Sequence, residues 1–477
     1  MFTYSNQINQ NCYDYSGLYK NSQPTSAVCK AQNTDTHYKK SANKCKNSIN
    51  YIPYNSTFTA SSLRTRLNSS EEESMYKDLV KSSDRQTKRA LDSLLKKGIL
   101  LNAESSDNST VLSNLHKVLT TQRAEGLENK ALLKDIIATL NDPHIITQQF
   151  GDIPKEKKDE SVAKYIDINS KINNQELNKH QAINDINVTH SGTCVAASIE
   201  FTLAKEQPAE FARIAEGLTS PKVEAEKLIH LDKLADNVLD AIWLLNAFEV
   251  PYTINDFYKA KLKFKPDESA ILRAQIQTKY KDPGERSPID ALMQSTFMQI
   301  GSQQSYNSLS DKRKGKFNQN DKGLIEFEKT FVESVVEDQN KISVTYQTVD
   351  ENARLIGYQT DMETLKKHLK DTIDSGHNVI LGYTQTDSNN VIINGHEITV
   401  TGYKLNPKNN KLIFICNDTD DNISKPIEYS EDFLLPRIHH AALPKEVIEK
   451  DVQMVENWVE GLNKFQELRK NKYRNAA

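Results

Sequence analysis

Residues 189–198 read THSGTCVAAS, a short polar turn that leads directly into a helix-forming stretch. The glycine and threonine before Cys194 place its sulfur at the first turn of a helix, and the alanines after it allow that helix to lie deep between other layers. A helix N-terminus lowers the pKa of a thiol, and the thiolate is the form that attacks a carbonyl carbon. A lone cysteine is more often an ordinary buried residue, so a nucleophile is predicted here only together with partners further along the chain.

Two strand-like segments downstream supply such partners. Residues 394–403 read NGHEITVTGY and place His396 at a strand entrance, where it can accept the thiol proton and return it to a leaving amine. Residues 412–418 read LIFICND and end the next strand at Asn417, which is expected to orient the imidazole. Neighbouring residues of a strand point to opposite faces, so only one of the two can orient the ring, and Asp418 is the alternative.

Three segments carry a resemblance to bacterial papain-like cysteine peptidases. That family opens its central helix with Gly-Thr-Cys-Val-Ala or Gly-Ser-Cys-Trp-Ala and places its histidine in a Gly-His-Ala-Val-x-Val-x-Gly-Tyr strand. It ends the following strand with Asn-Ser-Trp or, in the bacteriocin-processing relatives, with Asn-Asp-Pro. The segments that match are GTCVAA at residues 192–197, GHEITVTGY at residues 395–403 and FICND at residues 414–418. The resemblance extends over about residues 180–443.

The resemblance implies an α+β, papain-like fold, in which a central nucleophile helix packs against an antiparallel sheet. It also implies that Cys194 is the nucleophile, His396 the base and Asn417 the orienter. Asp418 takes the last role if the bacteriocin-processing enzymes are the nearer relatives.

One position departs from the family. Its oxyanion glutamine lies about six residues before the nucleophile, where this chain has Val188, and Asn187 is the nearest amide that could donate instead. The leading interpretation is a cysteine peptidase that hydrolyses peptide or amide bonds of a polypeptide substrate. Val188 favours a second interpretation, a non-catalytic papain-like scaffold used for protein binding. Transglutaminase-like acyl transfer uses the same residue order but is less favoured, since its histidine usually follows the cysteine more closely.

Composition divides the rest of the chain. Residues 1–65 are polar and poor in aliphatic side chains, cannot offset their ordering entropy by burial, and are expected to be disordered. Apolar residues at helical spacing predict a small helical module over 70–150, and the polar stretch 151–190 is expected to be a linker or approach loop. A helical insertion is expected at about 221–338 and a terminal helix at 444–477. The module is expected either to cover part of the cleft or to dock independently.

Composition also argues against several classes of function. The 61 lysines and arginines nearly balance the 64 aspartates and glutamates of the 477-residue chain, so nucleic acid and membrane are not expected partners. No signal peptide or membrane-spanning apolar run is visible, and five cysteines do not make a disulfide framework, so a cytoplasmic location is expected, with export by a route that needs no visible signal as the alternative. Without a Cys-x-x-Cys or His-Glu-x-x-His motif, no metal or cofactor is expected. The oligomeric state is left open.

Overall fold

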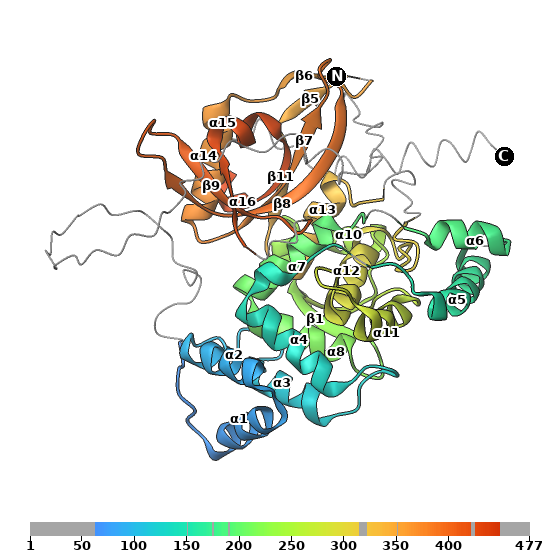
Figure 1. Ribbon diagram of the computed structural model, residues 1–477. Coiled ribbons are helices and arrows are strands. Elements are labelled where there is room, and N and C mark those ends of the chain that lie inside the picture. The colour runs from blue at the N-terminus through green and yellow to red at the C-terminus, as the bar shows by residue number, and fades with distance from the viewer. Residues whose placement is uncertain are drawn as a thin grey trace, which may run out of the picture.

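The structure is a computed structural model, and it describes residues 63–149, 151–173, 176–188, 191–313, 322–350, 352–420 and 425–448. The tail expected at 1–65 lies almost entirely outside the described residues, as does most of the terminal helix expected at 444–477. The chain is α+β, as expected, with helices gathered in one part and an antiparallel sheet in the other (Figure 1). Within the described ranges, no helix is long and apolar enough to cross a membrane.

Four helices and a 3-10 turn form the first described part of the chain. They are α1 (Ser70–Ser82), α2 (Arg85–Lys96), α3 (Val111–Thr120), α4 (Asn129–Asn141) and η1 (Pro143–Ile145). A side chain caps each of the first two helices. Ser69 Oγ accepts a hydrogen bond from the Glu72 amide at 3.1 Å, and Asp84 Oδ1 accepts one from the Thr87 amide at 2.8 Å. The helices expected over 70–150 are therefore present.

These helices share one hydrophobic core with the rest of the helical part. Leu133 and Ile137 of α4 lie in the same buried cluster as Phe201 of α7 (Cys194–Glu206) and Ile214 of α8 (Pro208–Leu218). Helix α4 packs directly on α7 and on α8. The N-terminal helices thus belong to the body of the protein and are not a separately docked module.

The stretch 151–190 is not the expected linker. It contains two helices, α5 (Lys155–Asn173) and α6 (Lys179–Ile186). Although the stretch is polar in composition, its two helices share a narrow apolar face, on which Val162, Tyr165 and Ile186 are buried. These side chains form a small separate cluster with Ile276 of α11 (Ala270–Tyr280). The expectation failed because a few apolar residues at helical spacing are enough to dock a helix that is otherwise solvated.

The insertion expected to be helical at about 221–338 is mixed. Its elements are β1 (Ala225–His230), α9 (Leu231–Leu234), α10 (Val238–Ala247), β2 (Tyr252–Asp256), β3 (Lys259–Phe264), α11, α12 (Pro288–Gly301) and α13 (Glu326–Glu337). The three strands pair antiparallel in the order β1-β3-β2. Alternate residues of β1 are buried, which is typical of a strand with one covered face, so the expectation of a purely helical insertion is wrong.

A six-stranded antiparallel sheet forms the C-terminal part, in the order β10-β9-β8-β7-β11-β4. Its strands are β4 (Lys341–Thr345), β7 (Val379–Thr386), β8 (Ile392–Leu405), β9 (Leu412–Asn417), β10 (Ile427–Ser430) and β11 (Ile438–Pro444). The remaining elements are β5 (Gln347–Val349), β6 (Leu355–Tyr358), α14 (Met362–Asp374), α15 (Glu431–Leu434), η2 (Leu435–Arg437) and α16 (Lys445–Ile448). Strands β8 and β9 form a hairpin, with one extra residue of β8 in a bulge between Val400 and Gly402.

The helical part meets the sheet along α7 and α13. Helix α7 packs on β7 and β8 (Figure 1). Helix α13 packs on β4 and β11. Lys329 of α13, with its side chain 1% exposed, donates to Glu397 Oε2 of β8 at 2.9 Å. A buried charge must be paired, so this ion pair fixes the sheet against the helices at the residue next to His396.

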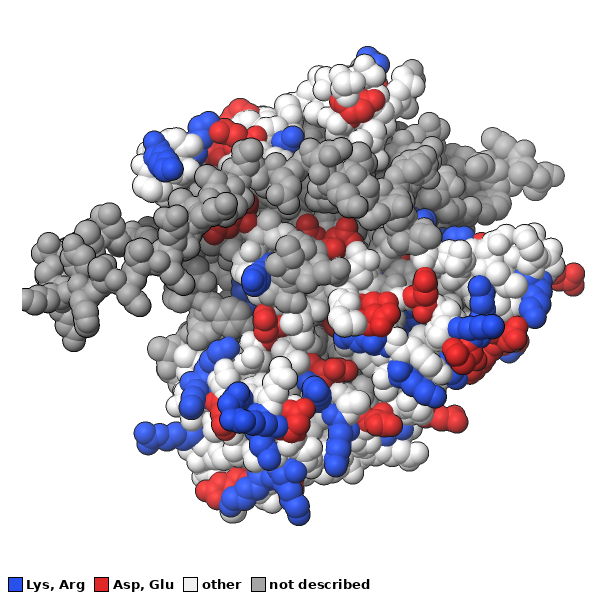
Figure 2. Space-filling model, viewed as in Figure 1, with Lys and Arg blue, Asp and Glu red and all other residues white. Residues whose placement is uncertain are grey.

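The outer surface of the helical part carries charges of both signs. Blue and red side chains are mixed over it in Figure 2. Many belong to exposed pairs along single helices, such as Lys77 with Glu73 at 3.3 Å and Lys171 with Asp167 at 2.8 Å. Exposed pairs of this kind contribute little to stability, so the fold depends on its cores rather than on its surface charges.

Leu133→Ala is expected to lower the free energy of unfolding by about 2–5 kcal/mol, because it removes a buried side chain from the shared core. Hydrogen exchange followed by mass spectrometry is expected to show the loss in the amides of α7 and α8 as well as in α4. Lys134→Ala, on the exposed side of the same helix, is the control and should change this free energy by no more than about 0.5 kcal/mol. Unchanged protection of α7 in Leu133→Ala would contradict a shared core.

Candidate active site

The candidate nucleophile lies where the N-terminus of α7 meets β8. Cys194 is the first residue of α7 and is partly exposed. The side chain of His396 in β8 is 10% exposed, and the Cys194 thiol lies close enough to its ring to raise the pKa of His396. Tyr383 of the neighbouring strand β7 packs edge-on against that ring, with the ring centroids 5.8 Å apart. The fold thus brings together two residues that the sequence predicts as nucleophile and base.

Asp418, and not Asn417, lies against the histidine. The distance between His396 Nε2 and Asp418 Oδ1 is 2.7 Å, and the Asp418 side chain is 6% exposed. Asn417 instead accepts a hydrogen bond from Nδ1 of His144, also at 2.7 Å. The expectation that Asn417 orients His396 is therefore wrong, and the alternative residue occupies that position.

The bulge in β8 decides between these two neighbours. Residues that lie opposite each other in an antiparallel pair share a face of the sheet. If the register at the hairpin turn continued, Asn417 would lie opposite Val400, on the face that His396 shares. The extra residue of the bulge moves the register by one, so that Asn417 pairs with Thr399 and turns away. Asp418 then comes to the face of His396.

The charges around the ring favour its protonated form. Burial by itself would lower the pKa of His396, but the Asp418 carboxylate and the Cys194 thiol beside it raise that pKa well above its ordinary value. Burial would likewise raise the pKa of Asp418. The imidazolium, together with the Asp420 amide that donates to Asp418 Oδ1 at 3.0 Å, holds that pKa below its usual range. Because Asp418 engages Nε2, Nδ1 is the ring nitrogen left for the thiol.

This arrangement has the parts needed for thiol chemistry. An imidazolium and a helix N-terminus both stabilise a thiolate. The same imidazolium can give its proton to a leaving group and later take one from water. These are the requirements of acyl transfer through a thioester. Among the residues that the structure describes, no group of three His, Cys, Asp or Glu side chains could hold a metal ion.

Two side-chain amides are candidates for binding an oxyanion, and they lie in different places. Asn187, the candidate from the sequence, is exposed at the C-terminal end of α6. Gln149, which the sequence did not indicate, is held beside the strand that carries the orienter, because its Nε2 donates to Asp420. The backbone carbonyl oxygen of Gln149 accepts a hydrogen bond from the backbone amide of Arg286 at 2.6 Å. The sequence did not predict a role for Gln149, because two helices, α5 and α6, separate it from Cys194 along the chain.

A second histidine supports the site from the opposite face of the sheet. His144 of η1 packs on Phe201 of α7, with the rings 5.1 Å apart, and donates to Asn417. Burial lowers the pKa of His144 in spite of that hydrogen bond, so the ring is neutral near neutral pH. It joins α7, β9 and the segment after α4, and the sequence offered no motif from which to predict it.

Comparison with family models, curated proteins and solved structures gives no match to this chain. The assignment of the site therefore depends on its own geometry. The decisive features are the contact of thiol and imidazole, the buried carboxylate behind the ring, and the helix N-terminus at the sulfur.

Asp418→Asn is expected to lower the pKa of His396, because the carboxylate that raises this pKa is lost while burial, which lowers it, remains. The wild-type pair stabilises the fold between two limits. Its contribution is lost as pH rises through the raised pKa of His396, and as pH falls through the lowered pKa of Asp418. Histidine titration by NMR measures the change.

Asn417→Ala is the matched control for this titration, since Asn417 faces away from the ring. It should leave the pKa of His396 in place. A His396 titration that is the same in Asp418→Asn as in the wild type would show that the carboxylate does not govern the ring.

Proposed function

We propose that this chain is a papain-like cysteine peptidase, or a closely related amide hydrolase, acting on a polypeptide substrate. The observation that supports this best is the row of Cys194, His396 and Asp418, in which a partly exposed thiol contacts an imidazole bonded to a buried carboxylate. Burying charges costs desolvation free energy. The position of this charged pair beside an accessible nucleophile favours catalysis over a scaffold used only for binding.

In the proposed reaction the Cys194 sulfur attacks the carbonyl carbon of the scissile amide, so that a C–S bond forms and the C–N bond breaks. The imidazolium of His396 gives its proton to the departing amine. The neutral imidazole then takes a proton from water, whose oxygen bonds to the thioester carbon. The thiolate leaves, and the carboxylic acid product is released. Asp418 keeps the ring in one tautomer and orientation throughout.

The topology supports a papain-like form of this site. The nucleophile begins a buried helix that packs on antiparallel strands, and those strands carry the histidine and then the carboxylate in chain order. Aspartate rather than asparagine behind the ring favours the bacteriocin-processing enzymes as the nearer of the resembling groups.

Cys194 is expected to react rapidly with iodoacetamide at pH 6, where an ordinary thiol is protonated. His396→Ala is expected to slow this labelling, and to reduce turnover of a peptide pool by about 10²–10⁴-fold. Cys194→Ser should abolish turnover. Peptide mass spectrometry separates Cys194 from the other cysteines. Cys416 is the internal reference for a structural thiol, because burial raises its pKa well above the ordinary value.

Labelling of Cys194 that is no faster than that of an ordinary exposed thiol, or that is unchanged in His396→Ala, would overturn the proposed function. Rapid labelling without turnover of any peptide would instead favour the binding scaffold.

We also propose Gln149 as the side-chain donor to the oxyanion, in place of Asn187. Its Nε2 lies 3.4 Å from the carbonyl oxygen of Asp420 and also donates to the carboxylate of that residue. A substrate carbonyl oxygen that develops negative charge accepts a stronger hydrogen bond than the neutral carbonyl oxygen of Asp420 does. It can therefore replace that carbonyl oxygen as an acceptor for Gln149 Nε2. Gln149 also precedes the nucleophile in the chain, as the oxyanion glutamine does in the resembling family.

Gln149→Ala is expected to lower kcat by about 10²–10³-fold, the usual cost of losing one oxyanion donor. Iodoacetamide labelling of Cys194 should stay within about twofold of wild type, because alkylation forms no oxyanion. Asn187→Ala is the matched control and should leave both rates unchanged, since its side chain is exposed at the end of α6. The opposite result, a loss confined to Asn187→Ala, would return the role to the residue expected from the sequence.

A further inference from the structure

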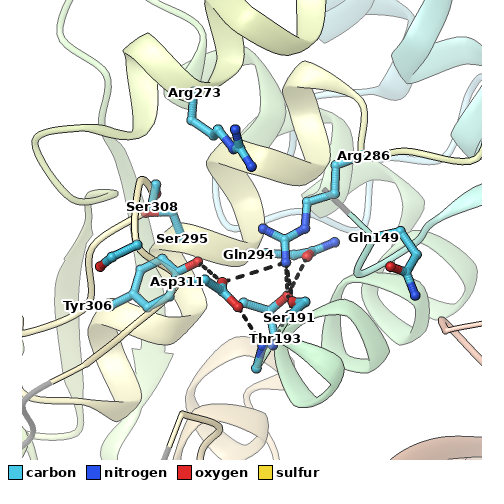
Figure 3. Close-up of polar contacts among 12 residues, drawn as sticks. Gln149, Ser191, Thr193, Arg273, Arg286, Gln294, Ser295, Tyr306, Ser308 and Asp311 are labelled. Atoms are coloured by element: carbon cyan, nitrogen blue, oxygen red, sulfur yellow. Dashed lines mark hydrogen bonds and ion pairs between the residues drawn. The ribbon is translucent and has the colours of Figure 1, made fainter. Parts of the chain in front are cut away.

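A buried polar network holds the turn that precedes the candidate nucleophile. We call Ser191, Gly192 and Thr193 the nucleophile turn. The Gly192 amide donates to Asp311 Oδ2 at 2.5 Å. Nη2 of Arg286 donates to Ser191 Oγ at 2.6 Å and to Thr193 Oγ1, and Figure 3 shows these bonds converging on the turn. Two side chains from distant parts of the chain thus engage every residue of the nucleophile turn.

These two side chains are themselves fixed. The side chains of Arg286 and Asp311 are 2% and 0% exposed, and Arg286 Nη2 lies 3.8 Å from Asp311 Oδ1. The Tyr306 hydroxyl donates to the same oxygen at 2.5 Å. Removing one partner of a buried ion pair leaves an uncompensated charge, so the pair resists rearrangement. The nucleophile turn is bonded to this pair and is therefore held rigid.

The network also draws Thr193 away from the helix that follows it. Thr193 Oγ1 donates to Gln294 Oε1 at 3.0 Å, and Gln294 Nε2 donates to the carbonyl oxygen of Thr147 at 2.9 Å and to Glu200 Oε2 at 3.0 Å. A threonine before a helix ordinarily accepts a hydrogen bond from an amide of the first turn. The Thr193 side chain makes no such bond to the described α7 amides, so those amides are not occupied by it.

Steric contact closes the turn from the other side. A Cβ added to Gly192 would lie 2.8 Å from the backbone carbonyl carbon of Lys322. Backbone cannot yield as a flexible side chain does, so only glycine fits between this segment and Asp311.

We propose that Arg286 and Asp311 are positioning residues for the thiol chemistry. They hold the nucleophile turn so that Cys194 stays against His396 and the first amides of α7 stay open to the oxyanion. This inference rests on the proposed function of the site. Neither side chain touches the substrate, and both act through the turn. A displacement of about 1 Å at the reacting atom can cost ~10²-fold in rate. A released Thr193 would also cap the helix and compete with the oxyanion for the same amides.

Arg286→Lys and Asp311→Asn test the proposal. The lysine keeps the charge opposite Asp311 but loses the guanidinium Nη2 that donates to both hydroxyls of the turn. The asparagine keeps an acceptor for the Gly192 amide but removes the charge that holds the guanidinium. Arg213→Lys is the matched control, since Arg213 on α8 is also an arginine with tight side-chain bonds, to both oxygens of buried Glu210 at 2.8 Å.

Three measurements are made on each full-length variant: the pH dependence of iodoacetamide labelling of Cys194, kcat and KM on the peptide pool, and thermal unfolding. The two network variants are expected to lower kcat by about 10- to 100-fold with little change in KM. They are also expected to lower the labelling rate at pH 6 and to move its pH dependence toward that of an ordinary thiol. Arg213→Lys should lose comparable thermal stability and keep the wild-type rates.

Folded network variants with labelling profiles and kcat within about twofold of wild type would overturn the proposal. The same holds if Arg213→Lys lowers the rates as much as they do, because the effect would then be one of stability alone. If Asp311→Asn does not fold, Arg286→Lys decides, since it preserves the buried charge balance. Failure of the proposed function is a separate outcome, in which wild-type Cys194 itself shows no rapid labelling at pH 6.

Discussion

Burial of α7 on every side is the constraint on which the other elements depend. Every residue from Val195 to Ala204 is buried, so this helix has no solvated face. A helix enclosed in this way needs small side chains where neighbours approach, and each polar group on it needs a partner. Ala196 and Ala197 meet the first need. Gln294 donates to Glu200 Oε2, and burial and the nearby charge of Asp290 raise the pKa of Glu200 well above the ordinary value, which favours the neutral acid over a buried charge.

Strand β8 serves two purposes with two adjacent residues. His396 points to the face that carries Asp418, while Glu397 points to the opposite face and pairs with Lys329 of α13. The carboxylate of Glu397 takes the space above Gly382, where a Cβ would lie 2.6 Å from Oε1. Because side chains alternate between the two faces of a strand, His396 of the candidate site and Glu397, which attaches the sheet to the helices, lie on opposite faces. The candidate base, His396, is held in place because its neighbour in the sequence anchors the sheet to the helices.

The sequence predicted those parts of the site that local pattern determines. Cys194 and His396 could be chosen because each sits in a short segment with a recognisable helix start or strand entrance. Asp418 could not be preferred over Asn417 as the residue that faces His396, since this depends on a single bulged residue between Val400 and Gly402. The residue types there did not predict a bulge.

Long-range contacts were beyond prediction for a related reason. Gln149 and His144 reach the site through tertiary packing, across helices that the sequence could not orient. In the stretch 151–190, sparse apolar residues such as Val162 and Tyr165 dock two helices that polar composition had suggested were loop. Local periodicity predicted the two strands that carry His396 and end at Asn417, whereas which elements touch was fixed by burial over the whole chain.

The bond between His144 and Asn417 spans 273 positions and has a consequence for synthesis. A ribosome releases α7 and its cysteine long before β8 and β9 exist, and a helix that is buried all round cannot complete its burial until those strands arrive. During elongation the thiol therefore has neither imidazole nor carboxylate beside it and reacts as any cysteine does. Under the proposed function, the growing chain therefore carries its candidate nucleophile in an inert form, and its reactivity begins only once the last part of the sheet has closed over it.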